Sequence, residues 1–215
     1  MMKKGLIIIF LTLISLLPAY GQKDTNNIVV FNEFDVNLNL GHDVEQQLGF
    51  GMGAYHSIMN QKKVNFIFGL EYNLNRQLID YTYEGHYAHA SNVRYTIHNL
   101  SVPFNLRYNI GKNIKAFIEL GIFLDLIVNS KRKGIMHTYL PNENSNIVYN
   151  EFFFKENARI TSPNYGICSG IGIKIPVKKR ELIIKSDYKF GIRELDSRGT
   201  NFYIRYFRLS IGINI

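Results

Sequence analysis

The chain has 215 residues, with 25 Lys and Arg against 17 Asp and Glu, which gives a formal net charge of +8. This length fits one domain and falls short of two independent cores. The basic residues gather in short runs such as Lys62–Lys63 and Lys178–Arg180 rather than on one face with aromatic stacking partners, so nucleic-acid binding is not expected. The single cysteine, Cys168, excludes an internal disulfide.

The first 21 residues have the organisation of a secretory signal peptide. A positive stretch, Met1–Lys4, precedes an apolar run over residues 6–17 and a small-residue tail that ends at Gly21. The apolar run is too short for a retained transmembrane helix, which needs about twenty residues. We therefore expect residues 1–21 to be cleaved and residues 22–215 to form an exported domain.

The exported part alternates apolar and polar residues with period two, which is typical of β-strands with unlike faces. Between residues 99 and 110 every even position is apolar and every odd position is polar, small or proline. Six such pairs in succession arise by chance about once in four thousand trials when half of the residues are apolar. The same pattern predicts eight strands, near residues 31–40, 47–59, 63–75, 95–110, 114–128, 164–177, 182–191 and 203–215.

The predicted connections between these strands alternate in length. Tight turns at 60–62, 111–113 and 178–181 separate longer links near 41–46, 76–94, 129–163 and 192–202. Outer-membrane barrels have short periplasmic turns and longer outer loops. The sequence therefore predicts an all-β, eight-stranded antiparallel up-and-down transmembrane β-barrel with periplasmic termini. The 129–163 link is long enough to extend the barrel wall above the membrane.

The charges on the polar faces favour a barrel whose polar side is enclosed. These faces carry six acids, Glu33, Asp35, Glu71, Glu119, Asp125 and Asp187, and six bases, Arg107, Lys115, Lys174, Lys185, Lys189 and Arg208. Buried charge is tolerated when it is paired, and side chains fill the interior of an eight-stranded barrel. The opposite faces are almost wholly Leu, Ile, Val, Phe and Tyr, as lipid requires. We predict a structural polar network in the lumen formed by Glu71, Arg107, Glu119, Asp125, Lys174, Lys185, Asp187 and Arg208.

One pair of predicted strands resembles a known family. Leu100–Tyr108, with the sequence LSVPFNLRY, is followed by Gly111 and by Lys115–Gly121, with the sequence KAFIELG. This segment resembles the outer-membrane β-barrel family of PorT type from Bacteroidetes-group bacteria, whose members carry a Leu-x-[Ile/Val]-Pro-x-x-Leu-[Lys/Arg]-Tyr strand, a short turn and a glycine-containing strand. The resemblance implies an outer-membrane barrel and an accessory role in protein secretion or envelope assembly.

The candidate chemical groups do not form a recognisable catalytic or metal site. His86 and His89 are close in sequence, but no Cys, Asp or Glu completes a metal-ligand set with recognisable spacing. His98 and Ser101 differ by three residues, which places them on opposite faces of a strand, and the adjacent His56 and Ser57 also point apart. We expect no enzyme activity, no metal and no cofactor.

The most economical function is a non-enzymatic outer-membrane barrel that serves as a structural or interaction module through its outer loops. Its expected partners are outer-membrane lipid, the barrel assembly machinery during biogenesis and a protein partner at the outer loops. Three alternatives remain open: an accessory component of secretion or envelope assembly, a narrow channel, and a soluble periplasmic binding barrel.

Overall fold

The structure is a computed structural model that describes residues 32–41, 45–58, 63–112, 114–141, 146–158, 160, 163–195 and 202–215. The expected signal peptide lies outside the described residues. Across those ranges, no helix combines the length and hydropathy needed to cross a membrane.

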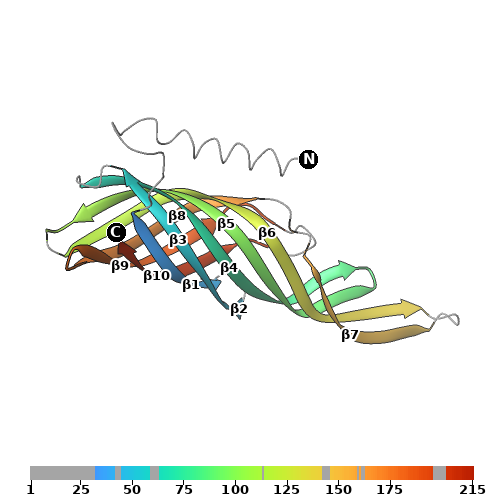
Figure 1. Cartoon of the computed structure of the whole chain (residues 1–215). Helices are drawn as coiled ribbons and strands as arrows, with labels where there is room; N and C mark the ends of the chain where they lie inside the picture. The colour runs from blue at the N-terminus through green and yellow to red at the C-terminus, as the bar shows by residue number, and fades with distance from the viewer. Residues whose placement is uncertain are drawn as a thin grey trace. The chain divides into compact units, whose positions relative to one another are not determined.

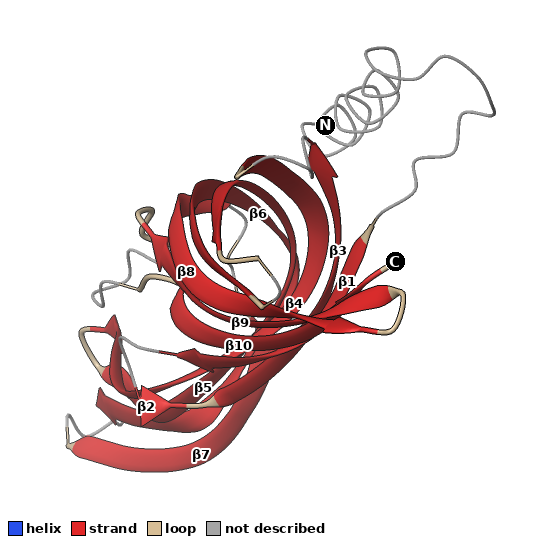
Figure 2. Cartoon of the chain, turned by 90° about the vertical axis from the view of Figure 1, so that its left-hand side faces the viewer, coloured by secondary structure: helices blue, strands red, loops and turns tan. Residues whose placement is uncertain are grey.

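Ten strands follow one another along the chain. They are β1 (Glu33–Gly41), β2 (Glu45–Gln46), β3 (Leu48–Ile58), β4 (Val64–Gly85), β5 (Ala88–Ile110), β6 (Lys115–Pro141), β7 (Ile147–Asn157), β8 (Asn164–Val177), β9 (Arg180–Gly191) and β10 (Arg205–Asn214). Eight of them pair in the order β1, β3, β4, β5, β6, β8, β9, β10, and β10 pairs with β1 to close a barrel. Figure 2 shows the closed ring of strands. All pairings are antiparallel, so the predicted eight-stranded fold is confirmed.

All eight predicted strands are present, but one predicted loop is wrong. The 76–94 link is a hairpin in which β4 and β5 continue to a two-residue turn at His86–Tyr87. The 129–163 link does extend the wall, because β6 continues to Pro141 and pairs with β7. The tight turn after β8 is confirmed at Lys178–Lys179, whereas residues 60–62 and 113 lie outside the described residues.

The wall has an apolar outer face and a polar inner face. On β5, Leu100, Phe104 and Leu106 are exposed, while the alternating Asn105 and Arg107 are buried. On β6 the regularly alternating apolar outward positions run from residue 116 to residue 126, which spans about 33 Å along the strand and about 23 Å across a bilayer at a 45° tilt. The exposed Val128 follows, where the register between β5 and β6 shifts. This height matches the apolar band of transmembrane barrels, about 25 Å.

Beyond this band the polarity of the strands inverts. On β5 the inward residues change from Asn99 and Ser101 to Ile97, Tyr95 and Val93, which are fully buried. They form an apolar cluster with Leu195, Phe202 and Ile204. We call the part of the sheet beyond the band the extension, comprising residues 76–85, 88–97, 130–141 and 147–157. It projects from one end of the barrel (Figure 1).

Candidate functional site

Charged side chains inside the barrel form ion pairs that cross the lumen. Near the end with the tight turns, which we call the turn end, Arg107 holds both carboxylate oxygens of Glu33 at 2.5 and 3.0 Å. Its Nε also donates to Glu119 at 2.5 Å. Lys174 Nζ lies 3.3 Å from the same Glu33. Glu33 lies on β1 and Arg107 on β5, so this contact joins strands that are three places apart around the barrel.

A second group of charges continues the network towards the extension. Glu71 is fully buried, and its Oε2 lies 2.5 Å from Lys189 Nζ and 2.8 Å from Arg208 Nη1. Arg208 also donates two hydrogen bonds to Asp187, at 2.8 and 2.6 Å. Lys185 lies 3.3 Å from Asp187 and 3.6 Å from Glu119, which links the two groups.

The network involves all eight strands of the wall. It includes Glu33 of β1, Glu71 of β4, Arg107 of β5, Glu119 of β6, Lys174 of β8, three residues of β9 and Arg208 of β10. From β3, Tyr55 donates a hydrogen bond to Glu71 at 3.0 Å. Aromatic rings pack among the charges, with the Arg107 guanidinium 4.3 Å from the centroid of Phe117. Such paired charges tie distant strands together and occupy the lumen.

The structure buries every residue of the lumen set chosen from the sequence and pairs seven of the eight. Asp125 is the exception, because it forms no ion pair within the described part of the chain and instead accepts a hydrogen bond from Asn164 at 2.9 Å. The predicted set omits two members of the network, Glu33 and Lys189. Both lie on the polar faces of predicted strands, so their positions in the alternating pattern already indicate that they point into the lumen.

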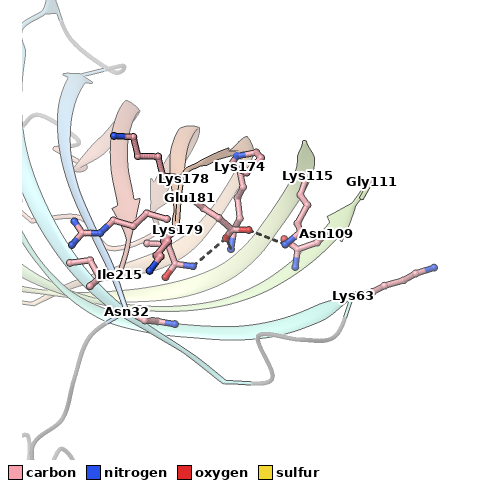
Figure 3. A pocket seen from close by; sticks show the side chains of 13 residues that line it. Asn32, Lys63, Asn109, Gly111, Lys115, Lys174, Lys178, Lys179, Glu181 and Ile215 are labelled. Carbon is pink, nitrogen blue, oxygen red and sulfur yellow. Dashed lines mark hydrogen bonds and ion pairs between the residues drawn. The ribbon is translucent and has the colours of Figure 1, made fainter. Parts of the chain in front are cut away.

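At the turn end the barrel opens into a cavity of about 730 Å³ (Figure 3). Glu181 joins three groups there, Lys115 Nζ at 2.9 Å, Lys174 Nζ at 3.9 Å and the Asn214 amide at 3.2 Å. Six of the thirteen residues that line the cavity are cations: Lys63, Lys115, Lys174, Lys178, Lys179 and Arg180. Lys174 also contacts Glu33, so the ion network closes the inner side of this cavity.

The inner face of the extension has an ion cluster of its own. Arg132 of β6 binds Glu84 of β4 and Glu156 of β7, and its guanidinium lies 5.4 Å from the Phe154 ring centroid. Although desolvation opposes it, hydrogen bonding to the two carboxylates raises the pKa of Arg132. This cluster holds β4, β6 and β7 together outside the apolar band.

The outer face of the extension carries a chain of hydrogen bonds that sequence reasoning missed. Ser91 Oγ lies 2.8 Å from His137 Nε2, and His137 Nδ1 lies 2.7 Å from the Tyr149 hydroxyl. Tyr149 donates to Glu151 at 2.8 Å, which raises the pKa of Tyr149. With His137 protonated at Nδ1, each group donates to the next from Ser91 to Glu151.

A β-bulge next to Ser91 positions this residue beside His137. Asn92 has a φ of 52°, in the left-handed region that Asn tolerates better than most residues. The β5–β6 register shifts there, so that two residues of β5 oppose Gly134 of β6. A Cβ at position 134 would lie 2.9 Å from the carbonyl oxygen of Ser91, so the close approach favours glycine.

The histidines considered in the sequence have other partners. His98 lies 2.6 Å from the hydroxyl of Tyr72, whereas Ser101 accepts a hydrogen bond from Lys189. His56 packs against an aromatic ring of β4. His89 stacks on His137 with ring centroids 4.6 Å apart. Within the described ranges, no group of three or more His, Cys, Asp or Glu residues could hold a metal ion.

The family described as outer membrane protein beta-barrel domain matches residues 22–197. No curated protein matches the chain in sequence. Among solved structures, Neisserial surface protein A (NspA) is similar over 86% of this chain and 95% of its own, at 12% identity and a TM-score of 0.49. Ail, the attachment invasion locus protein of Yersinia pestis, is similar over 86% of this chain and 98% of its own, at 9% identity and a TM-score of 0.37. The outer membrane enzyme PagL is similar over 84% of this chain and 99% of its own, at 16% identity and a TM-score of 0.46.

Proposed function

Because this chain belongs to the outer membrane protein β-barrel domain family and is an outer-membrane barrel protein, we propose that it is a non-enzymatic interaction module. Its barrel is the anchor, and its extension contacts a protein partner. The turn end faces the periplasm and the extension faces outward, as in barrels with short periplasmic turns and longer outer segments.

The observation that carries this proposal is the apolar surface of the extension. On its outer face, Phe153 and Ile147 are each 72% exposed, and Tyr149 between them is also exposed. Leu140 and Phe152 are exposed on the opposite face of the same two strands. These side chains lie on strands beyond the apolar band, where lipid tails do not cover them. Large apolar side chains that are this exposed outside a membrane are typical of contact sites for a partner.

The interior of the barrel supports an anchor better than the alternatives of a channel or a soluble binding barrel. The ion network and its aromatic rings occupy the lumen, whereas conducting porins use sixteen or more strands. A soluble binding barrel needs an apolar interior, but the buried core of this barrel includes Glu71, Arg107, Lys189 and Arg208.

Photocrosslinking in intact cells tests the proposal. A photoreactive amino acid at Phe153 should give a discrete protein adduct, because this side chain belongs to the proposed contact surface. The matched control is Phe104, an exposed aromatic residue within the apolar band, which should give lipid adducts only. Lipid adducts alone at both positions would overturn the proposal of a protein partner.

The finer assignment to the PorT-type branch rests on the β5–β6 hairpin. The Leu100–Tyr108 and Lys115–Gly121 segments lie on adjacent paired strands that contribute Arg107 and Glu119 to the ion network. Assignment to this branch implies an accessory role in secretion or envelope assembly. A deletion strain should then export fewer proteins to the cell surface, and unchanged export would dismiss this assignment.

A serine hydrolase is a second candidate function, favoured by the Ser91–His137 hydrogen bond alone. A serine bonded to a histidine, with the histidine oriented by a third group, is the arrangement of an activated nucleophile. A fluorophosphonate probe distinguishes the two candidates in the folded protein. Labelling that Ser91→Ala and His137→Gln both abolish would support the hydrolase, and absence of labelling in the unmutated protein would reject it.

A further inference from the structure

Five cations lie in two adjacent rows on the outer face of the extension. In the nearer row Arg76, Thr96 and Lys131 pair across β4, β5 and β6, and in the next row Arg94, Lys133 and Lys155 pair across β5, β6 and β7. The residues that flank them along the strands point inward and include the buried Tyr95 and Arg132. We call Arg76, Arg94, Lys131, Lys133 and Lys155 the cationic rows.

In the part of the chain that the structure describes, no carboxylate pairs with the cationic rows. None of the five has a carboxylate within ion-pair distance among the described residues. The inner-face carboxylates Glu84 and Glu156 are engaged by Arg132. Like charges directly opposite each other on neighbouring strands destabilise a sheet. An external anion bound to Arg94, Lys133 and Lys155 would therefore reduce the repulsion among these three cations on successive strands.

The height of the cationic rows indicates what that anion is. The last row of the apolar band contains Tyr72, Leu100 and Leu126, which are paired across β4, β5 and β6. The nearer cationic row lies four residues further along β4, at Arg76, which is about 13 Å along the strand and about 9 Å along the bilayer normal at a 45° tilt. The polar head-group layer occupies the first several ångströms beyond the hydrocarbon core.

We propose that the cationic rows bind the phosphate groups of phosphorylated lipids in the outer leaflet. This inference rests on the proposed function, because that function places the extension at the outer surface. Lys and Arg form short, charge-assisted hydrogen bonds with phosphate, and a guanidinium can hold two of its oxygens. Neighbouring strands are about 4.8 Å apart, so the three cations of the second row span about 10 Å and more than one of them can reach one phosphate.

Native mass spectrometry of the full folded chain in neutral detergent tests this inference, with lipid A as the probe. The charge-removing variant is Arg94→Gln, Lys133→Gln and Lys155→Gln combined. Each cation near a membrane surface contributes about 1 kcal/mol, so three should weaken lipid A binding by about two orders of magnitude. The matched control, Arg94→Lys, Lys133→Arg and Lys155→Arg combined, should bind within about threefold of the unmutated chain because it keeps every charge.

Two further arms identify the source of the phosphate and the class of partner. Lipid A stripped of its phosphates should bind weakly, and inorganic phosphate at equal concentration should not displace intact lipid A. Equal binding by the charge-removing variant, equal binding of the stripped lipid, or displacement by inorganic phosphate would each overturn the inference. If lipid A binding fails while Phe153 still gives a protein adduct, the lipid inference alone is wrong. If lipid A binds but no protein adduct forms, the proposed protein partner alone is wrong.

Discussion

Glu71 is the residue whose substitution tests the ion network most sharply. One oxygen of this fully buried carboxylate lies 2.5 Å from Lys189 and 2.8 Å from Arg208. Its other oxygen accepts a hydrogen bond from Tyr55 at 3.0 Å. Glu71→Gln keeps the size and most of the hydrogen-bonding capacity of the side chain but removes its charge, which leaves two buried cations beside a neutral amide.

The expected cost of Glu71→Gln follows from this geometry. Removing one partner of a buried ion pair costs about 3–5 kcal/mol, because the remaining charge is desolvated without compensation. Asp187 still neutralises Arg208 in the variant, whereas Lys189 loses its only ion-pair partner among the described residues and keeps the hydroxyl of Ser101 and nearby aromatic rings. Lys189→Met in the same chain should therefore recover more than about 1 kcal/mol of the loss through coupling between the two sites.

Urea unfolding in phospholipid vesicles measures these changes, with the folded fraction read from unboiled gels. Glu151→Gln is the control, because Glu151 belongs to the exposed side of the extension and its loss should cost less than about 1 kcal/mol. A cost for Glu71→Gln no larger than that of the control, or no recovery on adding Lys189→Met, would refute the view that the network stabilises the barrel.

Three other substitutions or measurements test separate parts of the account. Leu120→Arg places a charge in the middle of the apolar band and should lower the free energy of unfolding in vesicles by about 2–4 kcal/mol. Phe153→Arg on the extension should change this free energy by less than about 0.5 kcal/mol, and equal losses for the two variants would contradict the position of the band. Gly51→Ala should lower the free energy of unfolding by about 1–3 kcal/mol in the same titration, because the new Cβ would lie 2.6 Å from the side-chain oxygen of Asn37. An unchanged free energy would show that the wall tolerates the extra volume. Planar bilayers that contain the unmutated protein should show no discrete conductance steps, and regular steps would contradict a filled lumen.

The strands of the wall could be predicted because lipid and lumen make opposite demands on successive residues. On β5 the outward residues Leu100, Phe104 and Leu106 must be apolar, whereas the inward Asn105 and Arg107 lie among other polar groups. This contrast persists along the whole membrane-spanning part, so alternation alone locates each strand. It also selects the residues that point inward, but it does not show which of them meet.

The partners within the network depend on how the barrel closes. Glu33 of β1 reaches Arg107 of β5 across the lumen, and Lys189 of β9 reaches Glu71 of β4. Neither contact follows from sequence spacing, since the first joins residues 74 apart and the second joins residues 118 apart. The relative shift of the strands and the closure of the sheet together decide which charges lie at the same height.

The hairpin over residues 76–94 was missed because the alternation changes sign beyond the membrane. Inward positions such as Ile79 and Val93 pack in an apolar cluster, and outward positions such as Arg94 carry charge. Asn92 then shifts the parity once more through its left-handed backbone. For the same reason, the contact between Ser91 and His137, residues 46 apart, could not be read from the sequence.

This chain forms a closed barrel embedded in the outer membrane. Gel migration of the outer-membrane fraction, with and without boiling, tests it most directly. A closed barrel resists the detergent of the gel and stays compact, so we expect the unboiled protein in this fraction to migrate faster than the boiled protein. Identical migration before and after boiling, or recovery of the protein in the soluble periplasmic fraction, would contradict the account.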